Sequence, residues 1–141
     1  MNQQLEKIYA MACVIRNSEG KILMLKRVAT KKYIPNQWAV VGAAPLSSED
    51  NPEKIAHREM VDEIGFDGQI EKRGEEIVMC LEENGETLEW HVFPFLASVD
   101  KAEVVLNAEH SEYQWMSVSE ALALETSPII RKIILNMTAI E

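Results

Sequence analysis

Two tight-turn sequences restrict the folds open to this chain more than any other feature. Residues 17–20 (Asn-Ser-Glu-Gly) separate strand-like segments at 8–16 and 21–27, and residues 82–85 (Glu-Glu-Asn-Gly) separate strand-like segments at 69–81 and 86–99. Such turns join antiparallel neighbours, whereas parallel strands need a long crossover connection. One helix is expected between the two hairpins. This order of elements predicts an α+β fold rather than a regular alternation of strands and helices.

The remaining segments complete this order. A short buried strand is expected at 38–42, followed by a turn of small residues at 42–45, and a strand near 113–116 precedes two closing helices. Ser117 or Ser119 can cap the first of these helices, and Ser127 with Pro128 marks the start of the second. The last helix carries an apolar stripe that predicts a core position: Ile129, Ile130, Ile133, Ile134 and Met137.

Length and composition bear on domain number, location and partners. The 141 residues suffice for one domain, so a single domain over 1–141 is expected. The net charge of −9 argues against a nucleic-acid duplex or a membrane surface as a partner. The N-terminus does not resemble a signal sequence, and Cys13 and Cys80 lie in apolar segments typical of reduced core thiols, so a cytoplasmic location is the default.

Pro94 lies within the strand-like segment at 86–99, where a proline favours an edge position in the sheet or a β-bulge.

The helix between the hairpins is delimited at both ends and is expected at 52–64. Asn51 is a suitable N-cap, Pro52 suits the first turn, and Gly65 can take the left-handed conformation that ends a helix. At about 100° per residue, three carboxylates fall on one arc of roughly 100°: Glu59, Asp62 and Glu63.

This acidic arc has two interpretations. It can be a solvated face, in which Arg58 pairs with Asp62 for a few tenths of a kcal/mol. However, Glu59 and Glu63 are also one turn apart, and like charges at that spacing cost about as much. A divalent cation would remove the repulsion, and the arc therefore indicates a metal site.

An anionic substrate would need such a cation, or a local basic patch, because the chain as a whole repels it. Basic residues gather ahead of the helix, at Lys21, Lys26, Arg27, Lys31 and Lys32. They can form a phosphate-facing rim or an ordinary solvated loop.

Residues 58–66 (Arg-Glu-Met-Val-Asp-Glu-Ile-Gly-Phe) resemble the second half of the signature of the Nudix hydrolases. That signature reads Gly, five residues, Glu, seven residues, then Arg-Glu-apolar-x-Glu-Glu-x-Gly-apolar. Asp62 replaces the first glutamate of the pair, Asp50 stands in place of the isolated glutamate, and Ala44 in place of the opening glycine. The flanks also resemble the family, from the first hairpin to residues 109–115 (Glu-His-Ser-Glu-Tyr-Gln-Trp).

The resemblance implies an α/β/α sandwich with a mixed sheet between helices, and a role for each matched residue. Glu59 and Glu63 correspond to ligands of Mg²⁺ or Mn²⁺, Asp62 to a further ligand or a water-mediated contact, and Arg58 to the residue that orients the carboxylates. The family position of Ala44 supplies a backbone carbonyl to the metal. The implied reaction is attack of water on phosphorus in a diphosphate linkage. Because Asp62 is shorter than glutamate, slower turnover or a shifted preference between Mg²⁺ and Mn²⁺ is expected.

The general base and the substrate contacts are less defined. Base candidates are Glu109 and Glu112, then Glu89, while a solvated acidic loop is the alternative explanation for the first two. Arg27 resembles a phosphate-contacting position. The aromatic residues that could stack on a base, although each also suits a core position, are Trp90, Phe93 and Trp115. The three histidines show no metal-ligand spacing: His57, His91 and His110.

The expected activity is that of a Mg²⁺-dependent pyrophosphohydrolase acting on a small nucleoside phosphate. The short single-domain form most resembles the MutT-like members, which cleave nucleoside triphosphates, including oxidised ones, to the monophosphate and pyrophosphate. Alternatives are an ADP-ribose, sugar-nucleotide or dinucleoside-polyphosphate substrate, or a degenerate domain that binds a nucleotide or a protein without hydrolysis. A homodimer is compatible with the sequence.

Overall fold

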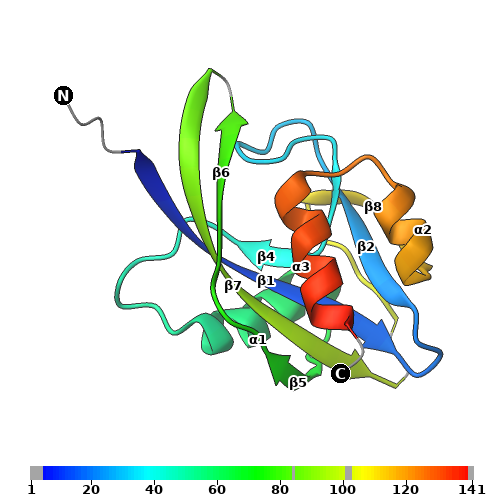
Figure 1. Cartoon of the computed structure of the whole chain (residues 1–141). Coiled ribbons are helices and arrows are strands. Elements are labelled where there is room, and N and C mark those ends of the chain that lie inside the picture. The colour runs from blue at the N-terminus through cyan, green and yellow to red at the C-terminus, as the bar shows by residue number, and fades with distance from the viewer. Residues whose placement is uncertain (1–4, 84, 101–102, 140–141) are drawn as a thin grey trace.

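The computed structural model describes residues 5–83, 85–100 and 103–139. Its centre is a pair of long parallel strands, β1 (Glu6–Asn17) and β7 (Glu86–Val99), in register from Glu6 opposite Leu88 to Asn17 opposite Val99 (Figure 1). The other strand pairs of the described chain are antiparallel, so the sheet is mixed. The expected α+β class with a mixed sheet is confirmed.

On the far side of β7 lie β5 (Gln69–Arg73) and β6 (Ile77–Glu83), both antiparallel to it. The single strand expected at 69–81 is therefore wrong, because the pairing breaks at residues 74–76. An edge position for Pro94 is also wrong, since β7 is a central strand. Pro94 faces this break, where its carbonyl accepts the Gly74 N–H at 2.9 Å. In a strand, the N–H and C=O groups of one residue point to the same side. The backbone nitrogen of Pro94 therefore also faces the break between β5 and β6, so the N–H that proline lacks removes no hydrogen bond from a continuous strand pairing.

The second hairpin joins β6 and β7, with Glu83 opposite Glu86, as expected from its turn sequence. Asn84, within that turn, lies outside the described residues.

The first hairpin is paired only beside its turn, where Arg16 lies opposite Ile22, and β1 and β2 (Ile22–Arg27) separate beyond it (Figure 1). Two short strands occupy the gap: β3 (Trp38–Ala39) pairs with β2, and β4 (Val41–Ala43) pairs with β1. The strand expected at 38–42 is thus divided between two partners. The outer neighbour of β2 is β8 (His110–Met116), which begins three residues before the expected 113.

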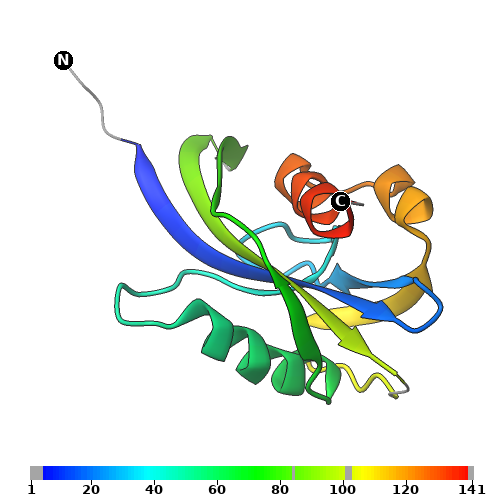
Figure 2. The same ribbon diagram turned by 60° about the horizontal axis from the view of Figure 1, so that its bottom comes forward.

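Helices cover both faces of the sheet, as Figure 2 shows. On one face α1 (Pro52–Ile64) packs on a core cluster that includes Met11, Cys13 and Phe95, whereas α2 (Val118–Ala123) and α3 (Pro128–Thr138) cover the other. The expected apolar stripe of α3 is fully buried. Cys13 is a core thiol as expected, but Cys80 is exposed, because it lies on the outward side of β6. In the described chain, no helix is long and apolar enough to cross a membrane.

The ends of α1 form as the sequence predicts. Asn51 Oδ1 accepts the backbone N–H groups of Glu53 and Lys54 at 3.0 and 3.3 Å, and Gly65 closes the helix at φ 85° with its N–H on the Val61 carbonyl. Ser117 caps α2 with a capping box, whereas the Ser127 side chain makes no cap bond to α3. These local signals fix the position of the acidic arc along the chain.

Gly42 on β4 is expected to tolerate no side chain. A Cβ built there would lie 2.9 Å from the backbone oxygen of Met11, which cannot move without displacing β1. Gly42→Ala is therefore expected to lower the free energy of unfolding by about 1–3 kcal/mol, measured by urea denaturation. An unchanged denaturation midpoint would contradict this close approach.

Candidate active site

A cavity of about 300 Å³ opens where β1 and β2 separate. Its floor includes Ala10 and Ala12 of β1 and residues 42–46, which run from β4 into the following turn. Charged side chains line one part: Arg27, Lys31, Asp50, Arg58, Glu59 and Glu109. Aromatic and aliphatic side chains line another: Tyr33, Ile34, Trp90, Val92, Ile129, Ile130 and Ile133. The cavity therefore joins a charged region beside α1 to an apolar region beside α3.

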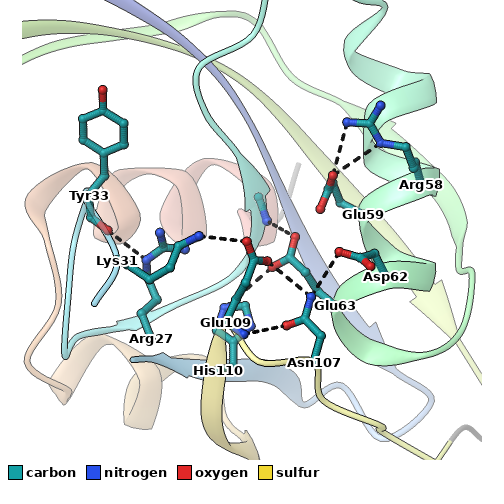
Figure 3. A network of polar contacts seen from close by, with 11 residues as sticks. Arg27, Lys31, Tyr33, Arg58, Glu59, Asp62, Glu63, Asn107, Glu109 and His110 are labelled. Carbon is teal, nitrogen blue, oxygen red and sulfur yellow. Dashed lines mark hydrogen bonds and ion pairs between the residues drawn. The ribbon is translucent and has the colours of Figure 1, made fainter. Parts of the chain in front are cut away.

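Three carboxylates converge at the charged part. Oxygens of Glu59, Asp62 and Glu109 lie within 4.8 Å of one another, although Glu109 is 47 positions beyond Asp62 in the chain (Figure 3). The first two come from neighbouring turns of α1, and Glu109 directly precedes β8. Three oxygen donors at this spacing suit a hard divalent cation.

Glu63 lies behind this group and is fully buried, on the last turn of α1. Its Oε2 accepts the Gly42 N–H at 3.4 Å (Figure 3). Burial, followed by the nearby charges of Glu59 and Glu109, raises the pKa of Glu63 to about 10. A cation beside the three carboxylates would reverse these effects, because it favours the ionised form.

Asn107 and Lys31 organise the carboxylates, and sequence reasoning missed both as partners of this group. Asn107 Nδ2 donates to Asp62 at 3.1 Å and to Glu109 at 3.4 Å, while its Oδ1 accepts the Glu109 N–H at 3.0 Å (Figure 3). Lys31 Nζ lies 2.8 Å from Glu109 Oε1. Burial raises the pKa of Glu109, but the bonds from Lys31 and Asn107 outweigh it and hold that pKa below its usual value. The two-residue spacing of Asn107 and Glu109, typical of an Asx turn, was the available signal.

The other residues matched to the signature also reach the cavity. Arg58 donates to Glu59 Oε1 from Nε and Nη2 at 3.4 and 3.3 Å, whereas the sequence suggested a pair with Asp62. Ala44 lines the cavity. Asp50 lines it too, and its Oδ2 accepts the Ser47 N–H at 2.8 Å, closing the turn before α1.

Arg27 ends β2 at the cavity wall, where its Nε donates to the Tyr33 carbonyl at 3.0 Å (Figure 3). Burial lowers the pKa of this guanidinium below its usual value, and the charges of the neighbouring Glu63 and Glu109 offset only part of that shift. Arg27 and Lys31 therefore place two cations beside the carboxylates, from the basic segment that the sequence singled out.

Several predicted side chains do not line this cavity. Trp115 and Phe93 pack against the core cluster on the α1 face, and Glu112 is exposed on β8. Glu89 bonds His91 Nε2 at 2.6 Å, away from the lining. Only Trp90 of the three aromatic candidates lines the apolar part, where its ring meets Tyr33 edge-on at 5.0 Å. Of the three base candidates, Glu109 lines the cavity, whereas Glu112 and Glu89 do not.

Residues 6–137 match the model of the NUDIX domain, which is almost the whole chain. The chain belongs to the Nudix family. The resemblance predicted from residues 58–66 is therefore confirmed, and the α/β/α sandwich with it.

Three proteins similar to this chain, two by structure and one by sequence, have the following names and extents of match. A MutT protein from Methanosarcina mazei has a TM-score of 0.75 at 24% identity, over 94% of each chain. The E. coli dihydroneopterin triphosphate pyrophosphohydrolase has a TM-score of 0.71 at 18% identity, over 94% of this chain and 96% of that one. By sequence, this Nudix chain is 25% identical to isopentenyl-diphosphate Delta-isomerase 2 of Photorhabdus laumondii over 82% of its own length. The match covers only 65% of the length of that relative.

The residues present fit a divalent metal. Three carboxylates converge within 4.8 Å, and the buried Glu63 Oε1 lacks a hydrogen-bond partner among the described residues. A buried carboxylate oxygen without a donor is costly, and cation coordination is one way to satisfy it.

Proposed function

We propose that this protein is a Mg²⁺-dependent pyrophosphohydrolase that cleaves a diphosphate linkage in a small nucleoside phosphate, most simply a nucleoside triphosphate. The observation that carries this proposal is the joining of a carboxylate cluster and an apolar region within one cavity. Membership of the Nudix family and the hydrolases among its structural neighbours support the same activity.

Glu59, Asp62, Glu63 and the Ala44 carbonyl are the proposed metal ligands. The bound ion would supply charge neutralisation at the phosphate oxygens. Arg58 donates to Glu59 and Asn107 donates to Asp62, so both ligands are oriented by the protein. Such supporting bonds commonly decide metal affinity in carboxylate sites.

Glu109 is the proposed acceptor of a proton from the attacking water. Its pairing with Lys31 makes it a weak base in the free protein. Substrate phosphates compete for Lys31 Nζ, and loss of that pairing raises the pKa of Glu109 toward a more effective value. Arg27 is the second cation proposed to face the phosphates.

The apolar region beside α3 is proposed to take the base of the nucleotide. Trp90 and Tyr33 offer aromatic surfaces there, and Ile129, Ile130 and Ile133 close the wall. A planar, weakly polar group is the kind of ligand that such a lining binds.

A substrate panel tests the proposal. Release of phosphate and pyrophosphate is measured in Mg²⁺ and in Mn²⁺ for nucleoside triphosphates, their oxidised forms, ADP-ribose, dinucleoside polyphosphates and inorganic triphosphate. A nucleoside triphosphate is expected to give the highest kcat/KM, well above inorganic triphosphate, which lacks a base. No metal-dependent release from any compound would refute the hydrolase.

The same panel separates the alternatives. A preference for ADP-ribose or a dinucleoside polyphosphate would keep the chemistry and change the substrate. Nucleotide binding without turnover would identify a degenerate domain. Because a sequence relative is an isopentenyl-diphosphate isomerase, that diphosphate is included, and its isomerisation without phosphate release would assign a different reaction.

A further inference from the structure

Two buried polar side chains face each other beneath the carboxylate cluster. His110 Nε2 lies 3.6 Å from Glu63 Oε1, and their side chains are 0% and 1% exposed. Among the described residues, neither Glu63 Oε1 nor either ring nitrogen of His110 has a hydrogen-bond partner. The gap between the two atoms is only slightly longer than a hydrogen bond.

Separate elements hold the two groups at this separation. Glu63 is fixed on α1 and through its Oε2 contact with the Gly42 N–H of β4. His110 is the first residue of β8 and lies opposite Arg27 of β2, where the strand register shifts. Figure 3 shows the imidazole directly below Glu109 and Glu63.

The absence of a hydrogen bond between His110 and Glu63 lowers the stability of the fold. A buried donor or acceptor without a partner costs about 1–3 kcal/mol, and here both members of one potential pair are unsatisfied. A shift of a few tenths of an ångström would satisfy both. Each carboxylate oxygen has two lone-pair directions, so a bond from His110 leaves Glu63 able to coordinate a cation.

We propose that His110 is a positioning residue for Glu63: its Nε2–H donates to Glu63 Oε1 and holds this carboxylate in the orientation that binds the metal. The inference rests on the proposed function, because it takes Glu63 as a metal ligand. It adds a further support for the cluster, beside Arg58, which donates to Glu59, and Asn107, which donates to Asp62 and Glu109.

Three substitutions distinguish a donor from a packing role. His110→Leu removes the donor and fills much of the space, His110→Gln places an amide N–H near the position of Nε2, and His110→Asn places one near Nδ1 instead. Mn²⁺ binding is measured for each by electron paramagnetic resonance, without nucleotide, beside a thermal melt. His91→Leu is the matched control, because His91 bonds Glu76 and Glu89 on the opposite part of the sheet.

His110→Leu is expected to weaken Mn²⁺ binding about 10-fold to 100-fold, the usual effect of losing a residue that supports a ligand. His110→Gln is expected to restore most of the affinity, His110→Asn to restore none, and His91→Leu to change nothing. If His110→Leu does not fold, the comparison of the Gln and Asn variants carries the test.

Two results would overturn the inference. Wild-type Mn²⁺ affinity in folded His110→Leu, or equal affinities in the Gln and Asn variants, would refute the role of His110 while leaving the proposed function intact. Absence of Mn²⁺ binding by the wild-type protein would refute both this role and the proposed metal site.

Discussion

Glu63→Gln is expected to reduce kcat/KM for the best nucleoside substrate on the order of a thousandfold at saturating Mg²⁺. Glutamine keeps the size of the side chain and an oxygen acceptor for the Gly42 N–H, but it removes the negative charge from the proposed ligand. Metal ions contribute several kcal/mol to phosphoryl-type transition states, and each factor of ten corresponds to about 1.4 kcal/mol. Steady-state kinetics with pyrophosphate detection measures the loss.

Glu112→Gln is the matched control, because Glu112 carries the same charge on the exposed side of β8. It is expected to retain wild-type kinetics. A Glu63→Gln enzyme that remains within about tenfold of wild type would show that Glu63 is not an essential ligand, even if the family reaction is found.

In the metal-free protein, Glu63 is expected to contribute a loss of stability as the pH rises, and Glu63→Gln is expected to remove that contribution. Burial raises the pKa of Glu63 from 4.5 to about 10 in the fold. Below pH 4.5 both states hold the proton, so the group adds no pH dependence to the stability. Between these values the unfolded chain releases a proton that the fold retains, so the contribution falls by about 1.4 kcal/mol per pH unit.

Melting temperatures in EDTA from pH 5 to pH 8 measure this effect as the difference between the variant and the wild type. The difference is expected to grow with pH in favour of Glu63→Gln, whereas Glu112→Gln follows the wild-type curve. Added Mg²⁺ is expected to stabilise the wild type more than Glu63→Gln, because a ligand that binds the fold shifts unfolding by mass action. Parallel curves for wild type and Glu63→Gln would contradict an elevated pKa.

Features encoded locally could be predicted from the sequence. The bounds of α1 depend on Asn51, Pro52 and Gly65, which act through bonds and dihedral angles within the helix and its ends. Both hairpins and the buried stripe of α3 depend equally on neighbours in the chain. Residues 58–66 then indicated the family, because this half of the signature lies within a single helix and its C-terminal cap.

Features that depend on distant pairing could not be predicted in this way. The parallel alignment of β1 with β7, and the separation of β1 from β2, join segments without a local signal. The face of the sheet to which each strand residue turns is also set by this pairing: Trp90 packs on the α3 face and lines the cavity, whereas Trp115 packs on the α1 face and does not. Asn107 and His110 gain their roles only when β8 is placed beside β2, next to the last turns of α1.

The placement of α1 and α3 on opposite faces of the sheet has a consequence for how such a protein can diversify. The two helices pack into separate core clusters, one containing Met60 and Ile64 and the other Ile129 and Ile133. Residues of α3 can therefore be exchanged, and the apolar wall reshaped, without repacking the helix that holds the carboxylates. Selection on this chain can alter the molecule that it accepts and the bond that it breaks as two nearly independent traits.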